Sequence, residues 1–304
     1  MQKGMVALCA GLALAPALAA DAPAAPPAAA APSMADILAA SPAGDWRALD
    51  PNNTLYMELP KGRVIIELAP DFAPKHAANI RALAKEGYFD GAFIVRSQDN
   101  YVVQWGWPED MPRKVKKAHA AEKAEFFRAV SPDLPYTPLP DPDTYAATVG
   151  FTAGFPAARD AEGKSTWLVH CYAMLGAGRG DTADSGGGAE LYAVNGHSPR
   201  HLDKNVTLVG RIVQGMELLS VMPRGTGPLG FYETPAERTA IKSVRLEADV
   251  PTAERANLEA LKTESPTFVK LIDARRFRRE SWFLDPSGHL GVCNMPIPVR
   301  KRGS

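Results

Sequence analysis

The pattern of hydrophobic and polar positions begins with two short runs that are rich in β-branched, aromatic and other apolar residues. Residues 54–59 read Thr-Leu-Tyr-Met-Glu-Leu and residues 63–68 read Arg-Val-Ile-Ile-Glu-Leu, a composition typical of strands. Pro60, Lys61 and Gly62 separate them, and the glycine is available for the positive φ of a tight turn. The pattern predicts a strand, a tight turn and a second strand.

A helix is predicted directly after this hairpin. Pro74 suits a first helical position, Lys85 falls in the last turn, and Gly87 supplies a C-terminal stop. The apolar residues between them recur at helical spacing and are Ala77, Ile80, Leu83 and Ala84.

Strand-like segments follow at residues 92–96 and 101–105, separated by a polar turn, and then at 167–175, 190–194, 206–213 and 240–246. A second helix is predicted to begin near Gly215 and to end before Arg224. Many short strands with only two helices favour a closed or nearly closed antiparallel barrel over a parallel α/β sheet. The predicted fold class is therefore mainly β, with its main domain over residues 46–250.

Two segments interrupt the barrel pattern. Residues 108–166 are rich in Pro, Asp, Lys and Ala, which predicts a long insertion with one helix around residues 118–130. Residues 251–304 are predicted to form a C-terminal helical extension with two helices. The apolar positions that suggest these helices are Ala253, Leu258 and Leu261, then Phe268, Leu271 and Ile272.

The N-terminal residues are typical of a targeting signal. Lys3 is the only early charge, residues 5–19 are apolar or small, and Ala17-Leu18-Ala19 resembles a cleavage site. The apolar run is shorter than the ~20 residues that a membrane-spanning helix needs. We therefore expect a signal peptide over residues 1–20, an Ala/Pro-rich linker over residues 21–45, and export to a bacterial periplasm without an integral membrane segment.

The overall charge excludes little but favours no polyanionic partner. Lys plus Arg equals Asp plus Glu at 34 each, so nothing indicates binding to nucleic acid or to an acidic membrane. Once the signal is removed, Cys171 and Cys293 remain. In an oxidising compartment they are available to form a disulfide, and two buried free thiols are the alternative.

The order of these elements resembles the cyclophilin family from about Thr54 to about Leu246. The strings that carry the resemblance are residues 62–79, 91–96, 101–106, 174–178, 190–194, 202–203 and 206–217. The resemblance implies a closed eight-stranded antiparallel barrel capped by two helices. It also implies peptidyl-prolyl cis-trans isomerase activity on unfolded or proline-containing polypeptides, binding of cyclosporin-like ligands, and no cofactor or metal.

The same resemblance assigns candidate site residues. Arg96 and Gln104, eight positions apart, match the family's catalytic pair. The substrate-binding groove would be formed by Tyr101, Val102, Gly176, Glu190, Tyr192, His201 and Leu202.

Several groove positions depart from the family. Gly176 stands where the family usually has an asparagine, and Glu190 replaces a glutamine. His201 replaces a tryptophan and Val206 replaces a histidine. A backbone contact survives the glycine, but the lost side chains put the family's usual affinity and turnover in doubt.

The predicted chemistry needs no nucleophile, metal or proton transfer. A prolyl amide resists rotation because its nitrogen donates its lone pair into the carbonyl, with a barrier of ~18–20 kcal/mol. A guanidinium aimed at that nitrogen binds the freed lone pair of the twisted amide more strongly than it binds the planar amide. Arg96 would serve in this way, and Gln104 would hold a substrate carbonyl.

Other interpretations stay open at this stage. Taken alone, Arg96 fits a surface ion pair, Gln104 a solvent-facing strand position, and Val102 a core position. The groove substitutions also fit a chaperone or scaffold that binds proline segments with little turnover. A metal-dependent hydrolase rests only on His197 and His201 with Asp203, too few ligands for a dependable site.

Overall fold

The computed structural model describes residues 32–197, 199–280 and 282–303. The predicted signal peptide, residues 1–20, and the part of the predicted linker up to residue 31 therefore lie outside the described residues. Among the described residues, no helix is both long and apolar enough to cross a membrane.

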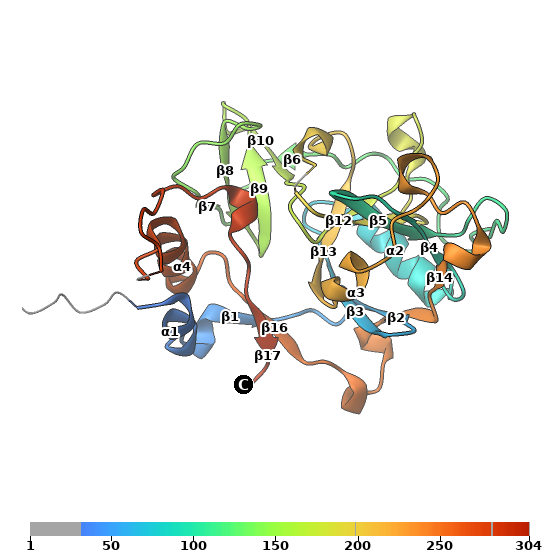
Figure 1. Ribbon diagram of the computed structural model, residues 1–304, viewed down its shortest axis with the longest axis horizontal. Coiled ribbons are helices and arrows are strands. Elements are labelled where there is room, and N and C mark those ends of the chain that lie inside the picture. The colour runs from blue at the N-terminus through green and yellow to red at the C-terminus, as the bar shows by residue number, and fades with distance from the viewer. Residues whose placement is uncertain (1–31, 198, 281, 304) are drawn as a thin grey trace, which may run out of the picture. The chain divides into compact units, whose positions relative to one another are not determined.

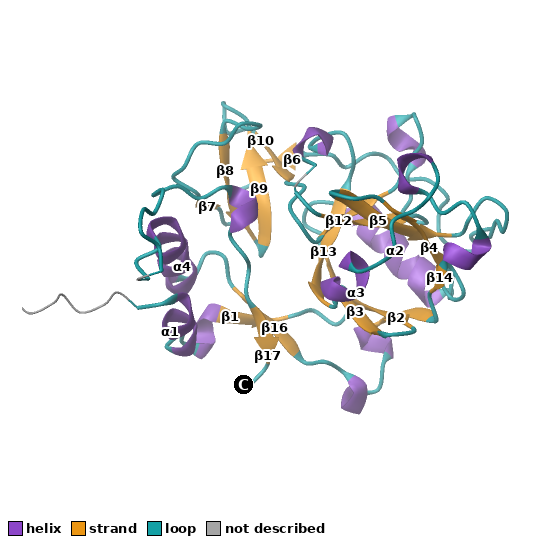
Figure 2. Ribbon diagram, in the orientation of Figure 1, coloured by secondary structure: helices purple, strands orange, loops and turns teal. Residues whose placement is uncertain are grey.

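The main architectural element is one antiparallel sheet of nine strands (Figures 1 and 2). Its two hairpins, over residues 54–68 and 92–106, confirm the strands predicted there. In hydrogen-bonded order the strands are β14 (Thr239–Ala240), β4 (Phe93–Ser97), β5 (Tyr101–Gly106), β12 (Leu191–Asn195), β11 (Met174–Ala177), β13 (Leu208–Gln214), β3 (Gly62–Leu68), β2 (Thr54–Leu59) and β15 (Ser243–Leu246).

The two outer strands of this sheet are neighbours in sequence. Only Ile241 and Lys242 separate β14 from β15. The amide of Ile241 donates to the carbonyl of Ala92 at 2.7 Å, and the amide of Lys242 donates to Glu58 at 2.8 Å. The single strand predicted at residues 240–246 is thus divided between the two ends of the sheet, so the predicted count of eight strands is wrong.

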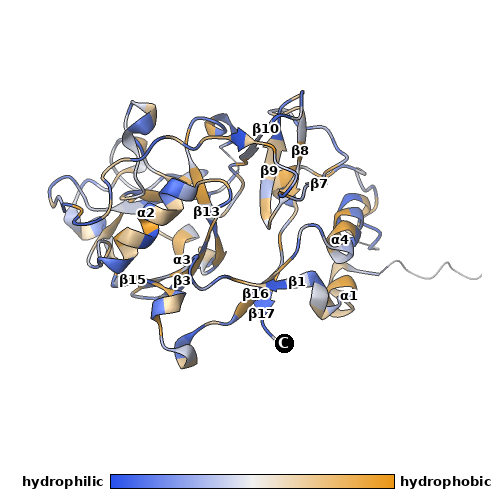
Figure 3. Cartoon of the chain, turned by 180° about the vertical axis from the view of Figure 1, so that it is seen from behind, coloured by the Kyte–Doolittle hydropathy of each residue, from blue (hydrophilic) through white to orange (hydrophobic). Residues whose placement is uncertain are grey.

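Two helices accompany the sheet. Helix α2 (Pro74–Lys85) confirms the predicted helix and buries its apolar positions in the core packed against the sheet. Helix α3 (Met216–Ser220) begins directly after Gly215, whose φ of 86° lies in the left-handed region, and is shorter than predicted. Figure 3 shows apolar residues along α2 and β13.

The insertion forms strands where a helix was expected. A five-stranded antiparallel sheet has the order β6 (Arg128–Ala129), β10 (Ser165–Leu168), β9 (Phe155–Arg159), β8 (Thr148–Thr152) and β7 (Thr137–Pro138). The helix predicted around residues 118–130 is wrong, since none of these residues is helical. The amides of Lys117 and His119 donate instead to the side chains of Glu86 and Asn79, both at 2.7 Å.

The C-terminal extension is only partly helical. Helix α4 (Pro266–Phe277) confirms the second predicted helix and buries Phe268, Leu271 and Ile272. The first predicted helix is wrong, because residues 258–261 form strand β16 (Leu258–Leu261) between β1 (Trp46–Ala48) and β17 (Val299–Lys301). Short strands that pair with distant segments override local helix propensity.

Ordered structure also begins inside the segment predicted as a linker. Ser33 caps helix α1 (Met34–Ala39) in a capping box with Asp36. The apolar side chains of α1 pack against the cluster that contains Phe268. The part of the chain that the structure describes further contains 3₁₀ turns η1 (Ala43–Asp45), η2 (Ala183–Ser185), η3 (Arg200–Leu202), η4 (Pro228–Gly230), η5 (Pro235–Glu237), η6 (Glu247–Asp249), η7 (Thr252–Glu254) and η8 (Val292–Asn294).

Two long-range links join the C-terminal extension and the N-terminal strand β1 to the rest of the domain. Cys171 and Cys293 form a disulfide with their Cα atoms 4.9 Å apart, which decides between the two alternatives left by the sequence. Glu67 of β3 lies between Arg47 of β1, at 2.6 Å, and Arg211 of β13, at 3.0 Å. A single carboxylate thus pairs with two guanidinium groups in a largely buried cluster.

Candidate active site

A β-bulge aims Arg96 out of the core. In the pairing of β4 with β5, Ile94 faces Trp105 and Arg96 faces Gln104, with the register shifting between them. In a regular strand Arg96 would share the core-facing side of Ile94, because side chains two apart lie on one face. The extra residue places Arg96 on the opposite face of the sheet, beside Gln104.

Four strands contribute one row of residues to that face. Directly opposite residues of antiparallel strands share a face, and the register pairs Arg96 with Gln104, Gln104 with Tyr192, and Tyr192 with Gly176. The row crosses β4, β5, β12 and β11 in turn. Candidate residues that lie as far apart in sequence as positions 96 and 192 thereby share one row.

The Arg96 guanidinium is half-buried and already oriented. Its Nη1 donates to Oε1 of Gln104 at 3.4 Å, and its Nε donates to the carbonyl of Leu229 at 2.7 Å. Its charge lies 5.2 Å from the ring centroid of Tyr101 and 4.9 Å from that of Phe231. Burial lowers the pKa of Arg96, but an arginine stays charged at neutral pH.

Glu190 fixes the other end of the Gln104 amide. Nε2 of Gln104 donates to Oε2 of Glu190 at 2.8 Å, while Oε1 of Gln104 accepts from Arg96. Because a carboxylate only accepts hydrogen bonds at neutral pH, this contact defines which way the amide points. Glu190 itself is exposed at the edge of the row.

The remaining candidate residues surround the row with apolar surface. Tyr101 stacks on the exposed His201, with ring centroids 6.0 Å apart and planes 5° apart. Leu202 follows in η3 and is half-buried. Val102 and Tyr192 are 2% and 6% exposed and belong to one apolar cluster. These two residues lie beneath the surface, so they would form the floor of a groove.

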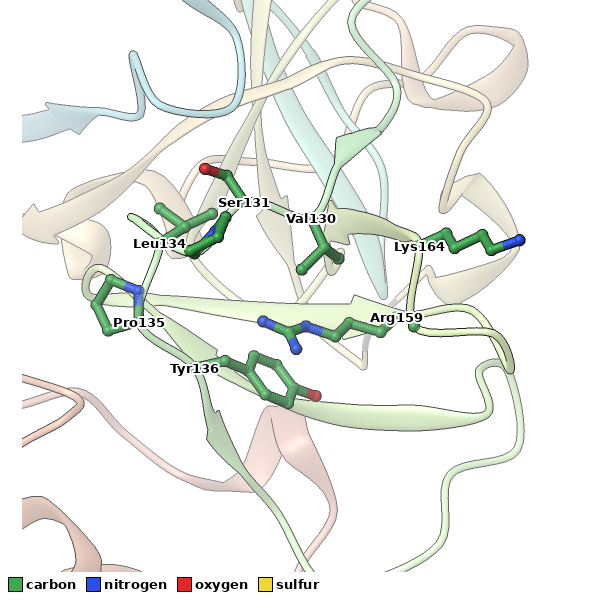
Figure 4. A pocket seen from close by; sticks show the side chains of 9 residues that line it. Val130, Ser131, Leu134, Pro135, Tyr136, Arg159 and Lys164 are labelled. Atoms are coloured by element: carbon green, nitrogen blue, oxygen red, sulfur yellow. The ribbon is translucent and has the colours of Figure 1, made fainter.

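A hollow of about 550 Å³ lies next to this row. It touches the row through Glu190, which holds Gln104, and through Phe231, which contacts Arg96. A second hollow, of about 630 Å³, lies in the insertion, where the Arg159 guanidinium lies 3.9 Å from the Tyr136 ring centroid (Figure 4). None of the candidate site residues lines that second hollow.

The histidines considered as metal ligands are not brought together for that role. Asp203 binds Arg200 and His170 instead. Within residues 32–197, 199–280 and 282–303, no group of three or more His, Cys, Asp or Glu side chains is placed to hold a metal ion.

Sequence reasoning missed two residues beside the candidate site. Phe231 pairs with Arg96 across an isolated β-bridge, and no pattern in its surroundings indicated a strand. His170 binds the hydroxyl of Tyr192. It fell inside a predicted strand at residues 167–175, so it resembled an ordinary strand position.

A family model identifies the protein family to which this chain belongs. The family model described as "Cyclophilin type peptidyl-prolyl cis-trans isomerase/CLD" matches residues 54–246. Since the match covers more than half of the chain, the chain belongs to the cyclophilin-type peptidyl-prolyl cis-trans isomerase family.

Individual relatives agree with this assignment over different lengths. A probable peptidyl-prolyl cis-trans isomerase of Brucella suis is 42% identical over 59 residues, which are 19% of this chain and 30% of that protein. A putative peptidyl-prolyl cis-trans isomerase of Staphylococcus haemolyticus is 24% identical over 194 residues, 63% of this chain and 89% of its own length. The chain thus spans about a third of the length of the Brucella relative that it matches.

A solved structure resembles most of the chain. The cyclophilin AquaCyp293 from Hirschia baltica superposes with a TM-score of 0.67 at 24% identity, covering 84% of this chain and 92% of that structure. At this identity the likeness supports the fold.

Proposed function

We propose that this chain is a peptidyl-prolyl cis-trans isomerase that accelerates rotation of X-Pro bonds, with Arg96 stabilising the twisted amide. The observation that carries the proposal is the row Arg96, Gln104 and Tyr192 on one face of the sheet. It combines a permanent cation, a neutral amide and an aromatic floor, the three features that prolyl rotation uses.

The proposed chemistry follows from the change in the prolyl nitrogen. In the planar amide its lone pair is delocalised, whereas in the twisted amide the lone pair is free to accept a hydrogen bond. An Arg96 donor aimed at that nitrogen binds the twisted form more strongly and so lowers the barrier. The contacts of Arg96 with Gln104 and Leu229 keep the guanidinium in place before substrate arrives.

Gln104 would hold the substrate carbonyl on one side of the rotating bond. Its Nε2 hydrogens are the donors for this contact, and Glu190 already takes one of them at 2.8 Å. An amide has two such hydrogens, so one stays available. Glu190, which replaces the family's usual glutamine, thus orients Gln104 and adds a negative charge beside the substrate.

The proline ring would lie over Tyr192, between Tyr101 with its stacked His201 and Leu202. The neighbouring hollow of about 550 Å³ offers room for the residues flanking the proline. We infer that unfolded or proline-containing polypeptides are the substrates and that cyclosporin-like ligands bind weakly. We further infer that the short link between β14 and β15 closes the sheet into a barrel.

We also propose that the protein acts in the periplasm on exported proteins. The apolar N-terminal residues support export, and so does the disulfide between Cys171 and Cys293. Disulfides persist in oxidising compartments and are rare in a reducing cytoplasm.

An exchange measurement tests the enzymatic proposal. The rate of cis-trans interconversion of a short Ala-Pro peptide is measured by NMR with wild type, Arg96→Ala and a control, Arg245→Ala, whose arginine pairs with Asp90 at 2.6 Å away from the row. We expect Arg96→Ala to lower kcat/KM by about 10²-fold, as for loss of one preorganised donor, and the control to keep wild-type activity.

Two results would contradict the proposal. Wild type that leaves the exchange rate unchanged defeats the isomerase, and acceleration that Arg96→Ala does not reduce defeats the role given to Arg96. If wild type leaves the exchange rate unchanged, and wild type and Arg96→Ala suppress aggregation of an unfolded protein equally, the chain is a proline-binding chaperone instead.

A further inference from the structure

A buried histidine lies directly behind the proposed proline site. His170 is 0% exposed, and its Nε2 lies 2.9 Å from the hydroxyl of Tyr192. On the other side, Asp203 lies 2.9 Å from Nδ1 of His170 and also accepts from its backbone amide at 2.9 Å. The His170 and Tyr192 rings are nearly parallel, with planes 12° apart.

The contacts define where the protons are. The Asp203 carboxylate accepts, so Nδ1 of His170 carries the proton. Burial lowers the pKa of His170 although Asp203 opposes this effect, and the ring is therefore neutral with a bare Nε2. Tyr192 then donates its hydroxyl proton to Nε2, so its only polar group is satisfied away from the substrate.

Gly176 makes room for this arrangement. A Cβ atom at position 176 would lie 2.1 Å from Cζ and 2.3 Å from the hydroxyl oxygen of Tyr192. The tip of the ring therefore occupies the space that a side chain would take on β11. Gly176, Tyr192 and His170 form one set, in which the glycine admits the ring and the histidine holds its hydroxyl.

The same hydrogen bonds reach the opposite wall of the site. Asp203 follows Leu202 directly, and it accepts from Nε of Arg200 at 2.7 Å. Arg200 also donates two bonds to Asp143 of the insertion, both at 2.8 Å. The insertion is thus connected through buried charges to the turn that carries His201 and Leu202.

We propose that His170 is a positioning residue for the proline site, fixing the Tyr192 floor relative to the Leu202 wall and thereby setting the affinity for the proline ring. The proposal rests on the proposed isomerase function and deepens it. His170 would act through Tyr192 and Asp203 and would not contact substrate. It therefore affects binding of the ring and leaves the step at Arg96 largely unchanged.

A double-mutant cycle of His170 and Tyr192 tests this role, with KM and kcat measured separately in the prolyl exchange assay. Tyr192→Phe keeps the ring and removes the hydroxyl, and we expect it to raise KM about threefold, the size of one net hydrogen bond. His170→Leu leaves the hydroxyl buried without a partner, and we expect KM to rise about tenfold. In both variants kcat should stay within about twofold of wild type.

The combined variant is the informative one. If the two residues act through one hydrogen bond, combining His170→Leu with Tyr192→Phe removes the unpaired hydroxyl, so KM should rise only about threefold rather than the roughly thirtyfold expected of independent sites. His76→Leu is the matched control. His76 is equally buried at 2% exposed but binds Glu125 away from the row, so its loss should change stability and leave KM unaltered.

The outcomes separate this inference from the proposed function. If wild type is active and the two substitutions have independent effects on KM, or if they lower only kcat, the positioning role of His170 alone is overturned. Wild type that neither accelerates exchange nor binds a prolyl peptide overturns the isomerase and this inference together. Tyr192→Phe retains every apolar contact of the ring, so the comparison of Tyr192→Phe with wild type does not depend on whether His170→Leu folds.

Discussion

Removing the disulfide should cost a large part of the stability of this protein. Cys171 and Cys293 are 122 residues apart in sequence, and the chain-entropy model gives a stabilisation of about 5 kcal/mol for a loop of that length. Residual structure in the unfolded chain reduces the effect. We therefore expect Cys171→Ser with Cys293→Ser to lower the free energy of unfolding by about 3 kcal/mol.

Urea unfolding followed by circular dichroism measures this loss. Wild type is unfolded with and without a reducing agent, and the doubly substituted variant is unfolded under the same two conditions. Reduction should shift the wild-type midpoint to the value of the variant. It should leave the variant unchanged, since the described part of that chain then has no bridge to reduce.

A specific result would refute the reasoning. If reduced wild type keeps the midpoint of the oxidised protein while thiol titration shows that the bridge is open, the bridge does not constrain the unfolded chain. A midpoint shift in the doubly substituted variant on reduction would likewise show that the reducing agent acts elsewhere.

Three further predictions concern one glycine of the main sheet and two sets of paired charges. Gly176→Ala forces a Cβ against a buried ring, so urea unfolding should show a loss of about 1–3 kcal/mol, whereas Gly44→Ala, with nothing within 4 Å, should be close to neutral. Glu67→Gln leaves two arginines without a carboxylate and should cost about 3–5 kcal/mol; an unchanged melting curve would contradict this estimate. Hydrogen bonds from Arg276 hold the pKa of Asp141 below its usual value of 3.8. The ionised Asp141 therefore stabilises the fold above pH 3.8, and this contribution is lost as the pH falls further. Asp141→Asn should flatten the decline in unfolding free energy that wild type shows below that pH.

The sequence predicted the nine-stranded sheet better than the rest of the fold. The hairpin over residues 54–68 and helix α2 are regular elements with clear turn and end signals, and both were found where predicted. The strand predicted at residues 167–175 is divided between β10 of the insertion and β11, and the strand predicted at residues 240–246 is divided between β14 and β15. The second division depends on where the two outer strands of the sheet meet, which no local pattern encodes.

The insertion and the C-terminal extension were harder to predict because their elements pair at long range. Strand β16 depends on β1, more than 200 residues earlier in the chain, and on β17. In isolation its sequence, Leu-Glu-Ala-Leu, favours a helix. Likewise, residues 117 and 119 give their amides to the Glu86 and Asn79 side chains of a different segment.

The residues of the candidate site also differ in how well the sequence predicted them. Arg96 and Gln104 lie on adjacent strands with a recognisable composition, so a family resemblance located them, and the structure places them side by side. His170 could not be found in this way, because its partners Tyr192 and Asp203 are 22 and 33 positions away. A buried polar group is recognised only once those partners are known.

The three-stranded sheet of β1, β16 and β17 has a consequence for the order of assembly. Trp46 pairs with Leu261, and Ala260 pairs with Val299, so the first and third strands are present together only after residue 299 has been synthesised. Closing such long loops carries a high entropic cost before any contact repays it. We expect the hairpin of β2 and β3 to form early and this small sheet to dock last, after the whole chain has been synthesised.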